Sequence, residues 1–180
     1  MTGLDLADKK ILMIVAQKNF RDEEFFEPRD IFEDAGVDIT VASNSMEEAF
    51  GTLGGKVTPD VSIDNVNIAE FDAVVIAGGG GSKEFLWSNK KLHKLVKDAF
   101  EHEKVVAAIC VSPVVLARAG VLEDRRATVF KDPACIKELE KGGASYEDED
   151  VIVADNVVTA CGPKAAEEFG EAVLETLRKL

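Results

Sequence analysis

The strongest constraint on the fold comes from short apolar runs that alternate with amphipathic segments along the whole chain. Nearly continuous apolar residues fill 10–16 (KILMIVA), 71–77 (FDAVVIA) and 105–110 (VVAAIC), and a fourth run of strand type covers 37–43 (VDITVAS). Runs of this length are typical of strands that are covered on both faces. Such strands, separated by helical segments, predict a parallel sheet with helices on both of its faces.

Helical periodicity fills most of the chain between and after these runs. Four segments carry apolar residues at helical spacing: 27–36, 83–103, 112–120 and 163–180. The chain shows no internal repeat and no linker, so we expect one domain over residues 1–180.

Two stretches interrupt the alternation of strands and helices. Residues 47–71 contain glycines and short β-prone pieces, which indicate either a hairpin or an irregular excursion. Residues 142–162 predict two β segments joined by a turn at residues 154–156.

Composition excludes several classes of function. The formal net charge of −13 argues against nucleic acid and against anionic membrane surfaces, because both attract clusters of Lys and Arg. No apolar run is long enough to span a membrane, and the first ten residues do not resemble a signal peptide. Three cysteines without CxxC spacing, and only two histidines, predict neither a disulfide framework nor a zinc site. We therefore expect a reducing, cytoplasmic location.

Three loops follow predicted strands on the side where open parallel sheets bind ligands, beyond the carboxyl ends of the strands. Residues 17–28 (QKNFRDEEFFEP) follow the first strand and are rich in carboxylates. Four glycines, 78–81, follow the run FDAVVIA, and Cys110 ends the run VVAAIC. Together these loops offer carboxylates, free backbone N–H groups and a thiol.

Cys110 stands where a buried strand ends and a helix led by Pro113 begins. Such a strand–turn–helix presents a nucleophile at the edge of the sheet, and a helix N-terminus stabilises a thiolate. The alternative is a small buried hydrophobic residue at a strand end. The glycines predict either a nest of N–H groups for an anion or a flexible turn. The acidic residues Asp22, Glu23, Glu24 and Glu27 predict a solvated loop ahead of a helix, unless a partner singles one of them out.

The motifs AAICVSP, VVIAGGGG and RDEEFFEP, together with DNVVTACGPKAAEEFG near the end, resemble the ThiJ/PfpI superfamily over nearly the whole chain. That family includes intracellular proteases, the parkinsonism-associated protein deglycase and cofactor-free glyoxalases. The resemblance implies a flavodoxin-like three-layer sandwich with a nucleophile elbow. It also implies a homodimer or a higher homo-oligomer.

The resemblance assigns roles to four positions. The family's reactive cysteine matches Cys110. Its glutamate, four residues before a proline, matches Glu24, which is implied to be protonated and to hydrogen-bond the thiolate. The oxyanion donors match the backbone N–H groups of Gly79 and Val111. No organic cofactor and no metal are implied.

The chain departs from the family at two histidine positions. Protease-like members carry a histidine directly after the cysteine, where this chain has Val111, and deglycase-like members carry one near the next strand, where it has Phe130. His93 and His102 are expected on the surface of a helix. The departures weaken the peptidase interpretation and leave a Cys–Glu pair.

Three functions stay open from the sequence. The favoured one is a cysteine-dependent enzyme of glyoxalase or deglycase type, which acts on a small carbonyl compound or a modified protein. The second is a cysteine peptidase or amidase. The third is a redox-sensing, stress-protective protein without enzymatic activity, whose thiol oxidises to a sulfinate.

Overall fold

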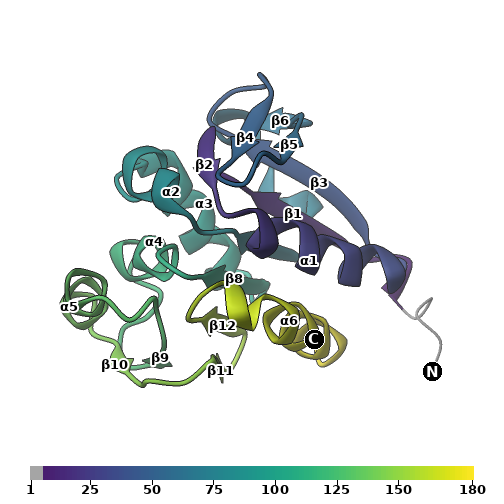
Figure 1. The fold of residues 1–180 in the computed structure, drawn as a ribbon. Coiled ribbons are helices and arrows are strands. Elements are labelled where there is room, and N and C mark those ends of the chain that lie inside the picture. Colours follow the sequence, from purple (N-terminus) through teal and green to yellow (C-terminus); the bar gives the residue numbers. More distant parts are fainter. Residues whose placement is uncertain (1–5) are drawn as a thin grey trace.

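The computed structural model describes residues 6–180, and its centre is a seven-stranded sheet (Figure 1). The strand order is β11-β12-β8-β7-β1-β3-β6, and every neighbouring pair is parallel except β11 with β12. The bounds are β1 (Lys10–Ile14), β3 (Asp38–Ser43), β6 (Val61–Ser62), β7 (Ala73–Ile76), β8 (Val105–Ile109), β11 (Val151–Ala154) and β12 (Val157–Ala160). The predicted, mainly parallel sheet is confirmed, and the hairpin predicted around residues 154–156 joins β11 to β12.

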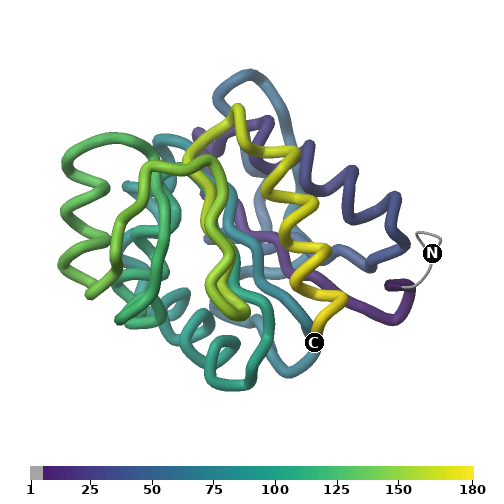
Figure 2. Tube along the Cα trace, turned by 90° about the horizontal axis from the view of Figure 1, so that it is seen from below, coloured from purple at the N-terminus to yellow at the C-terminus, as the bar shows by residue number. Residues whose placement is uncertain are grey.

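Helices cover both faces of this sheet, which confirms the expected three-layer α/β sandwich. The first and last helices pack side by side on one face, while α3 and α4 pack on β8 from the other (Figure 2). The bounds are α1 (Asp22–Asp34), α2 (Gly80–Phe85), α3 (Lys90–Glu101), α4 (Pro113–Arg118), α5 (Pro133–Lys141) and α6 (Ala166–Arg178), with short 3₁₀ turns η2 (Ile63–Asn65), η3 (Ile68–Glu70) and η4 (Pro163–Ala165). No helix among residues 6–180 is long and apolar enough to cross a membrane.

Two small sheets flank the central one. β2 (Lys18–Phe20), β4 (Ala49–Gly51) and β5 (Lys56–Val57) form a three-stranded sheet, and β9 (Arg126–Ala127) pairs with β10 (Ser145–Tyr146). Residues 47–71 thus contain both the expected hairpin, β4–β5, and an irregular stretch with two 3₁₀ turns. β2 was not predicted, because three residues with two polar side chains carry no strand pattern.

Two predicted helix boundaries are wrong. The single helix expected over 83–103 is two helices, because Asn89 caps a new one: its side-chain Oδ1 accepts from the backbone N–H of Leu92 at 3.0 Å. The acidic segment expected to be a loop is the first two turns of α1, which begins at Asp22 rather than near residue 27. Carboxylates in a first turn suit the partial positive charge of a helix N-terminus, so acidity did not indicate a loop there.

Candidate functional site

Cys110 follows β8 directly, and its backbone leaves the sheet abruptly. Its φ of 66° lies in the left-handed region, which L-residues other than glycine rarely adopt. Its N–H donates to the carbonyl of Ala160 at 2.9 Å, and its carbonyl accepts from the N–H of Phe130 at 2.7 Å. The backbone is therefore satisfied on both sides, and the thiol is directed out of the strand with 7% of the residue exposed.

The glycine turn after β7 lies directly against this thiol. A Cβ built on Gly78 would lie 2.6 Å from the Cβ of Cys110 and 2.5 Å from Oε1 of Glu24. The next residue, Gly79, has a φ of 107°, and a Cβ there would lie 2.4 Å from the backbone nitrogen of Arg21. Glycine is required at both positions, because the loop before α1 and the Cys110 turn close on this backbone. The other two glycines of the run, Gly80 and Gly81, belong to α2 rather than to a loop.

Glu24 is the carboxylate that the structure brings to Cys110. It lies in the first turn of α1, is fully buried, and accepts from the N–H of Gly78 at 3.0 Å through Oε1. Among residues 6–180, Oε2 has no hydrogen-bond partner, and the carboxyl group interacts with the Cys110 thiol. Burial raises the pKa of Glu24 to about 8, although the bonds with Cys110 and Gly78 and the charge of Arg21 oppose this shift. Near neutral pH the carboxyl therefore keeps its proton.

The Cys110 thiol is subject to opposing effects. Burial raises its pKa, and so does Glu24 when that carboxyl is ionised, whereas hydrogen bonds from the N–H groups of Gly79 and Val111 lower it. When Glu24 holds its proton, the like-charge repulsion is absent and the acid can donate to the sulfur. The net effect raises the pKa of Cys110, and the two groups titrate as a coupled pair. The structure thus brings together the four positions singled out in the sequence: Cys110, Glu24, Gly79 and Val111.

A buried pair of serines ties the glycine turn to the Cys110 turn. The hydroxyls of Ser82 and Ser112 lie 3.0 Å apart, and Ser112 Oγ donates to the carbonyl of Ala77 at 2.7 Å. Both serines are fully buried. In addition, the indole Nε1 of Trp87 donates to the carbonyl of Val111 at 2.9 Å. These contacts fix the relative position of the two turns whose N–H groups face the sulfur.

The other acidic residues of the segment have different partners. Arg21 binds Glu23 through two hydrogen bonds of 2.8 and 2.9 Å and holds the pKa of that carboxyl below its ordinary value. Asp22 accepts from the backbone N–H groups of Leu53 and Gly55 at 2.7 Å each, so it holds the tip of the β4–β5 hairpin. The fourth carboxylate, at position 27, is exposed. Position 24 alone in this segment supplies a carboxyl to the thiol.

Neither histidine contacts Cys110. A ring nitrogen of His93 lies 2.7 Å from the carbonyl of Trp87, and His102 Nδ1 lies 2.7 Å from the carbonyl of Asp98. His93 is half-buried rather than on the surface as expected, whereas His102 is exposed. Within the described chain, no group of three or more His, Cys, Asp or Glu side chains is arranged to hold a metal ion.

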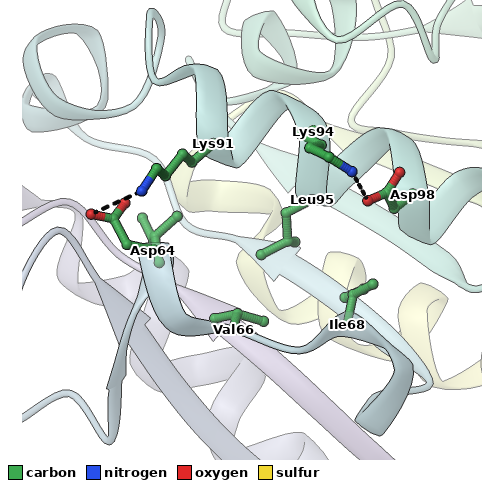
Figure 3. Close-up of a pocket in the computed structure, with 8 residues that line it drawn as sticks. Asp64, Val66, Ile68, Lys91, Lys94, Leu95 and Asp98 are labelled. Atoms are coloured by element: carbon green, nitrogen blue, oxygen red, sulfur yellow. Dashed lines mark hydrogen bonds and ion pairs between the residues drawn. The ribbon is translucent and has the colours of Figure 1, made fainter.

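Two of the hollows on the described surface differ in their position relative to Cys110. One, of about 380 Å³, adjoins the Cys110 turn and is lined by Phe130, Lys131, Asp148, Asp150, Cys161, Gly162, Pro163 and Lys164. The other, of about 290 Å³, lies between α3 and the η2–η3 segment, with Val66, Ile68 and Leu95 on its floor and ion pairs at its rim (Figure 3). This second hollow runs along α3, and neither Cys110, Glu24 nor the glycine turn lines it.

The chain matches a known protein family over most of its length. Residues 9–176 match the model of the DJ-1/PfpI family. The chain belongs to this family. It is 49% identical over 175 residues to an uncharacterised protein of Methanocaldococcus jannaschii, with 97% of this chain and 85% of that protein covered. The crystal structure of a ThiJ/PfpI domain protein from Brachyspira murdochii superposes with a TM-score of 0.91 at 37% identity, covering 95% of this chain and 97% of that one.

Two DJ-1/PfpI relatives with named activities also align over most of their length. Protein/nucleic acid deglycase 2 of Escherichia coli is 34% identical over 172 residues, with 94% of this chain and 98% of the relative covered. The glutathione-independent glyoxalase DJR-1.2 of Caenorhabditis elegans is 28% identical over 173 residues, with 95% and 90% covered.

Proposed function

We propose that the protein is a cysteine-dependent enzyme that converts reactive 2-oxoaldehydes to 2-hydroxy acids. The observation that carries the proposal is the buried carboxyl of Glu24, whose pKa is raised to about 8, beside a thiol that accepts two backbone N–H groups. A general acid–base works best when its pKa lies near the working pH. The names of the glyoxalase and deglycase relatives support chemistry on carbonyl compounds.

The reaction begins with the thiolate of Cys110, which adds to the aldehyde carbon of the substrate and forms a C–S bond. The proton of Glu24 goes to the aldehyde oxygen, which gives a neutral hemithioacetal and leaves Glu24 as a carboxylate. That carboxylate removes the hydrogen from the aldehyde carbon, and an enediolate forms, in which the hydroxyl proton on the former aldehyde oxygen passes to the neighbouring oxygen. Glu24 then returns a proton to the neighbouring carbon, which gives a thioester of the 2-hydroxy acid.

Water hydrolyses the thioester and restores the thiol. The N–H groups of Gly79 and Val111, which face the sulfur in the free protein, are in place to bind the oxygen that becomes negative in this step. Since only 7% of Cys110 is exposed, the entrance suits a small aldehyde better than a folded protein chain.

Conversion of methylglyoxal to lactate, followed by NMR in phosphate buffer without glutathione, tests the proposal. We expect wild type to turn over, and Cys110→Ala and Glu24→Gln to lose activity by about 10²-fold or more. In D₂O, deuterium should enter carbon 2 of lactate, because the Glu24 proton exchanges with solvent. Glu23→Gln is the matched control and should keep its activity, since Glu23 binds Arg21 and not Cys110. Full activity of Glu24→Gln would refute the proton shuttle, and inactive wild type would refute the substrate class.

A further inference from the structure

The ladder between β8 and β12 brings a second thiol beside Cys110. The paired residues run in register up to Ile109↔Ala160. The N–H of Cys110 donates to the carbonyl of Ala160 at 2.9 Å and completes this last pair, so Cys161 is the first residue beyond it on the neighbouring strand. The ladder ends there, because the carbonyl of Cys110 accepts from the N–H of Phe130 instead. Neighbouring strands lie about 4.8 Å apart. That spacing is inside the range of about 4.4–6.8 Å between Cα atoms that disulfides span.

Cys161 lies at an open side of this turn. It is half-buried and lines the hollow of about 380 Å³ together with Phe130 and Gly162. The backbone N–H of Phe130 binds the carbonyl of Cys110, so the wall of the hollow is continuous with the Cys110 turn. The hollow has room for a small oxidant and for rotation of the Cys161 side chain.

A carboxylate is placed to take the proton of Cys161. Its Sγ donates to Oδ1 of Asp150 at 3.6 Å, and Lys164 Nζ lies 3.4 Å from the same oxygen. Burial and the charge of Asp150 raise the pKa of Cys161, so this sulfur stays a thiol near neutral pH. Burial raises the pKa of Cys110 too, but the N–H groups of Gly79 and Val111 stabilise its thiolate once it forms, and peroxides react with thiolates, so we take Cys110 as the first sulfur to be attacked.

We propose that Cys161 resolves the peroxide-oxidised form of Cys110, so that the two residues close an intramolecular disulfide. In the first step the Cys110 thiolate attacks hydrogen peroxide: an S–O bond forms, the O–O bond breaks, and the leaving hydroxide takes a proton to become water. In the second step the Cys161 sulfur, rotated about χ1 and deprotonated by Asp150, attacks the Cys110 sulfur. An S–S bond forms, the S–O bond breaks, and a second water leaves. Two thiols are oxidised while one peroxide is reduced.

This disulfide would divert Cys110 from the irreversible path. A sulfenic acid without a thiol in reach proceeds to the sulfinic acid. The inference does not rest on the carbonyl chemistry proposed above, because neither step involves an aldehyde. Cys135 is the matched control: it is fully buried in α5, and burial raises its pKa to about 11.

The test adds one equivalent of hydrogen peroxide to the reduced protein and then maps non-reduced peptides by mass spectrometry. In wild type we expect the peptides of Cys110 and Cys161 to be joined, and two thiols to be lost for each peroxide consumed. In Cys161→Ser only one thiol is lost, and dimedone labels Cys110 at least tenfold more than in wild type. Cys135→Ser should behave as wild type does.

Three results would each overturn the inference. One is a Cys110 sulfinate in wild type while Cys161 stays open to alkylation. Another is equal dimedone labelling of wild type and Cys161→Ser, which would show that Cys161 does not reach the oxidised sulfur. The last is a disulfide between two protein chains in place of the internal one. Far-UV circular dichroism of Cys161→Ser and Cys161→Ala, both of which remove the second thiol, distinguishes a lost resolving step from a lost fold.

Discussion

Replacing Glu24 by glutamine should change how the stability of the protein depends on pH. In the native state the pKa of Glu24 is raised from 4.5 to about 8, chiefly by burial. The folded protein therefore binds this proton more tightly than the unfolded chain does, and its stability falls as pH rises between these two values. The stabilising effect is complete below about pH 4.5 and is lost above about pH 8. The shift corresponds to about 5 kcal/mol of unfolding free energy, at about 1.4 kcal/mol per pKa unit.

Glu24→Gln isolates this contribution, because the amide keeps an oxygen that can accept from Gly78 but cannot ionise. We expect the unfolding free energy of the variant minus that of wild type to grow with pH by up to about 1.4 kcal/mol per unit, and to level off above pH 8. Urea unfolding of both proteins at five pH values from 5 to 9 measures the difference. Subtraction removes the titration of all groups that the two proteins share.

Between pH 5 and 9 the control variant Glu23→Gln should differ from wild type by a constant amount of unfolding free energy. The pKa of Glu23 is lowered by its hydrogen bonds with Arg21, so its stabilising effect is present at neutral pH and is lost in acid. If the free-energy curves of wild type and Glu24→Gln run parallel from pH 5 to 9, Glu24 does not carry a raised pKa. The acid–base role assigned to it would then be wrong as well.

Two further substitutions test the geometry of the site. Gly78→Ala should lower the rate of carbonyl turnover by about 10²-fold, because the new Cβ would lie 2.5 Å from Oε1 of Glu24. The control Gly80→Ala, whose Cβ would have no atom within 4 Å, should keep the wild-type rate. Equal rates for the two variants would contradict the close approach. Ser112→Ala removes the hydrogen bond from the serine hydroxyl to the buried carbonyl of Ala77. We expect the unfolding free energy, measured in urea, to fall by about 1–3 kcal/mol, and the turnover rate to fall with it. An unchanged urea midpoint would count against a structural role of the serine pair.

The sheet could be predicted from the sequence because its signal is local. The runs 10–16, 71–77 and 105–110 are apolar at every position that a doubly covered strand buries, and all three form central strands. The division between α2 and α3 could not be predicted, because the apolar spacing continues across it. The division depends on Asn89, whose side chain accepts a hydrogen bond from the backbone N–H of Leu92 and so begins a new helix there. An asparagine side chain can also point to solvent within a continuous helix, so the sequence alone does not indicate the cap.

The site was only partly predictable for a related reason. Cys110 is marked locally, by the end of an apolar run and by Pro113, and the family resemblance singled out Glu24 among several carboxylates. The pairing of Ser82 with Ser112 joins residues 30 positions apart, so it becomes visible only in the folded chain. The neighbouring position of Cys161 depends on the β8–β12 register in the same way.

The backbone of Cys110 has a consequence for how the chain can evolve. A left-handed φ of 66° at a residue with a Cβ costs about 1–2 kcal/mol relative to glycine, which adopts that conformation freely. Glu24, fully buried, also reduces stability above its ordinary pKa. Glycine at position 110 and an uncharged side chain at position 24 would therefore give a more stable fold than the thiol and the acid do. A thiol and a buried acid at these positions thus cost folding stability, a cost that the reactivity proposed for the pair would offset.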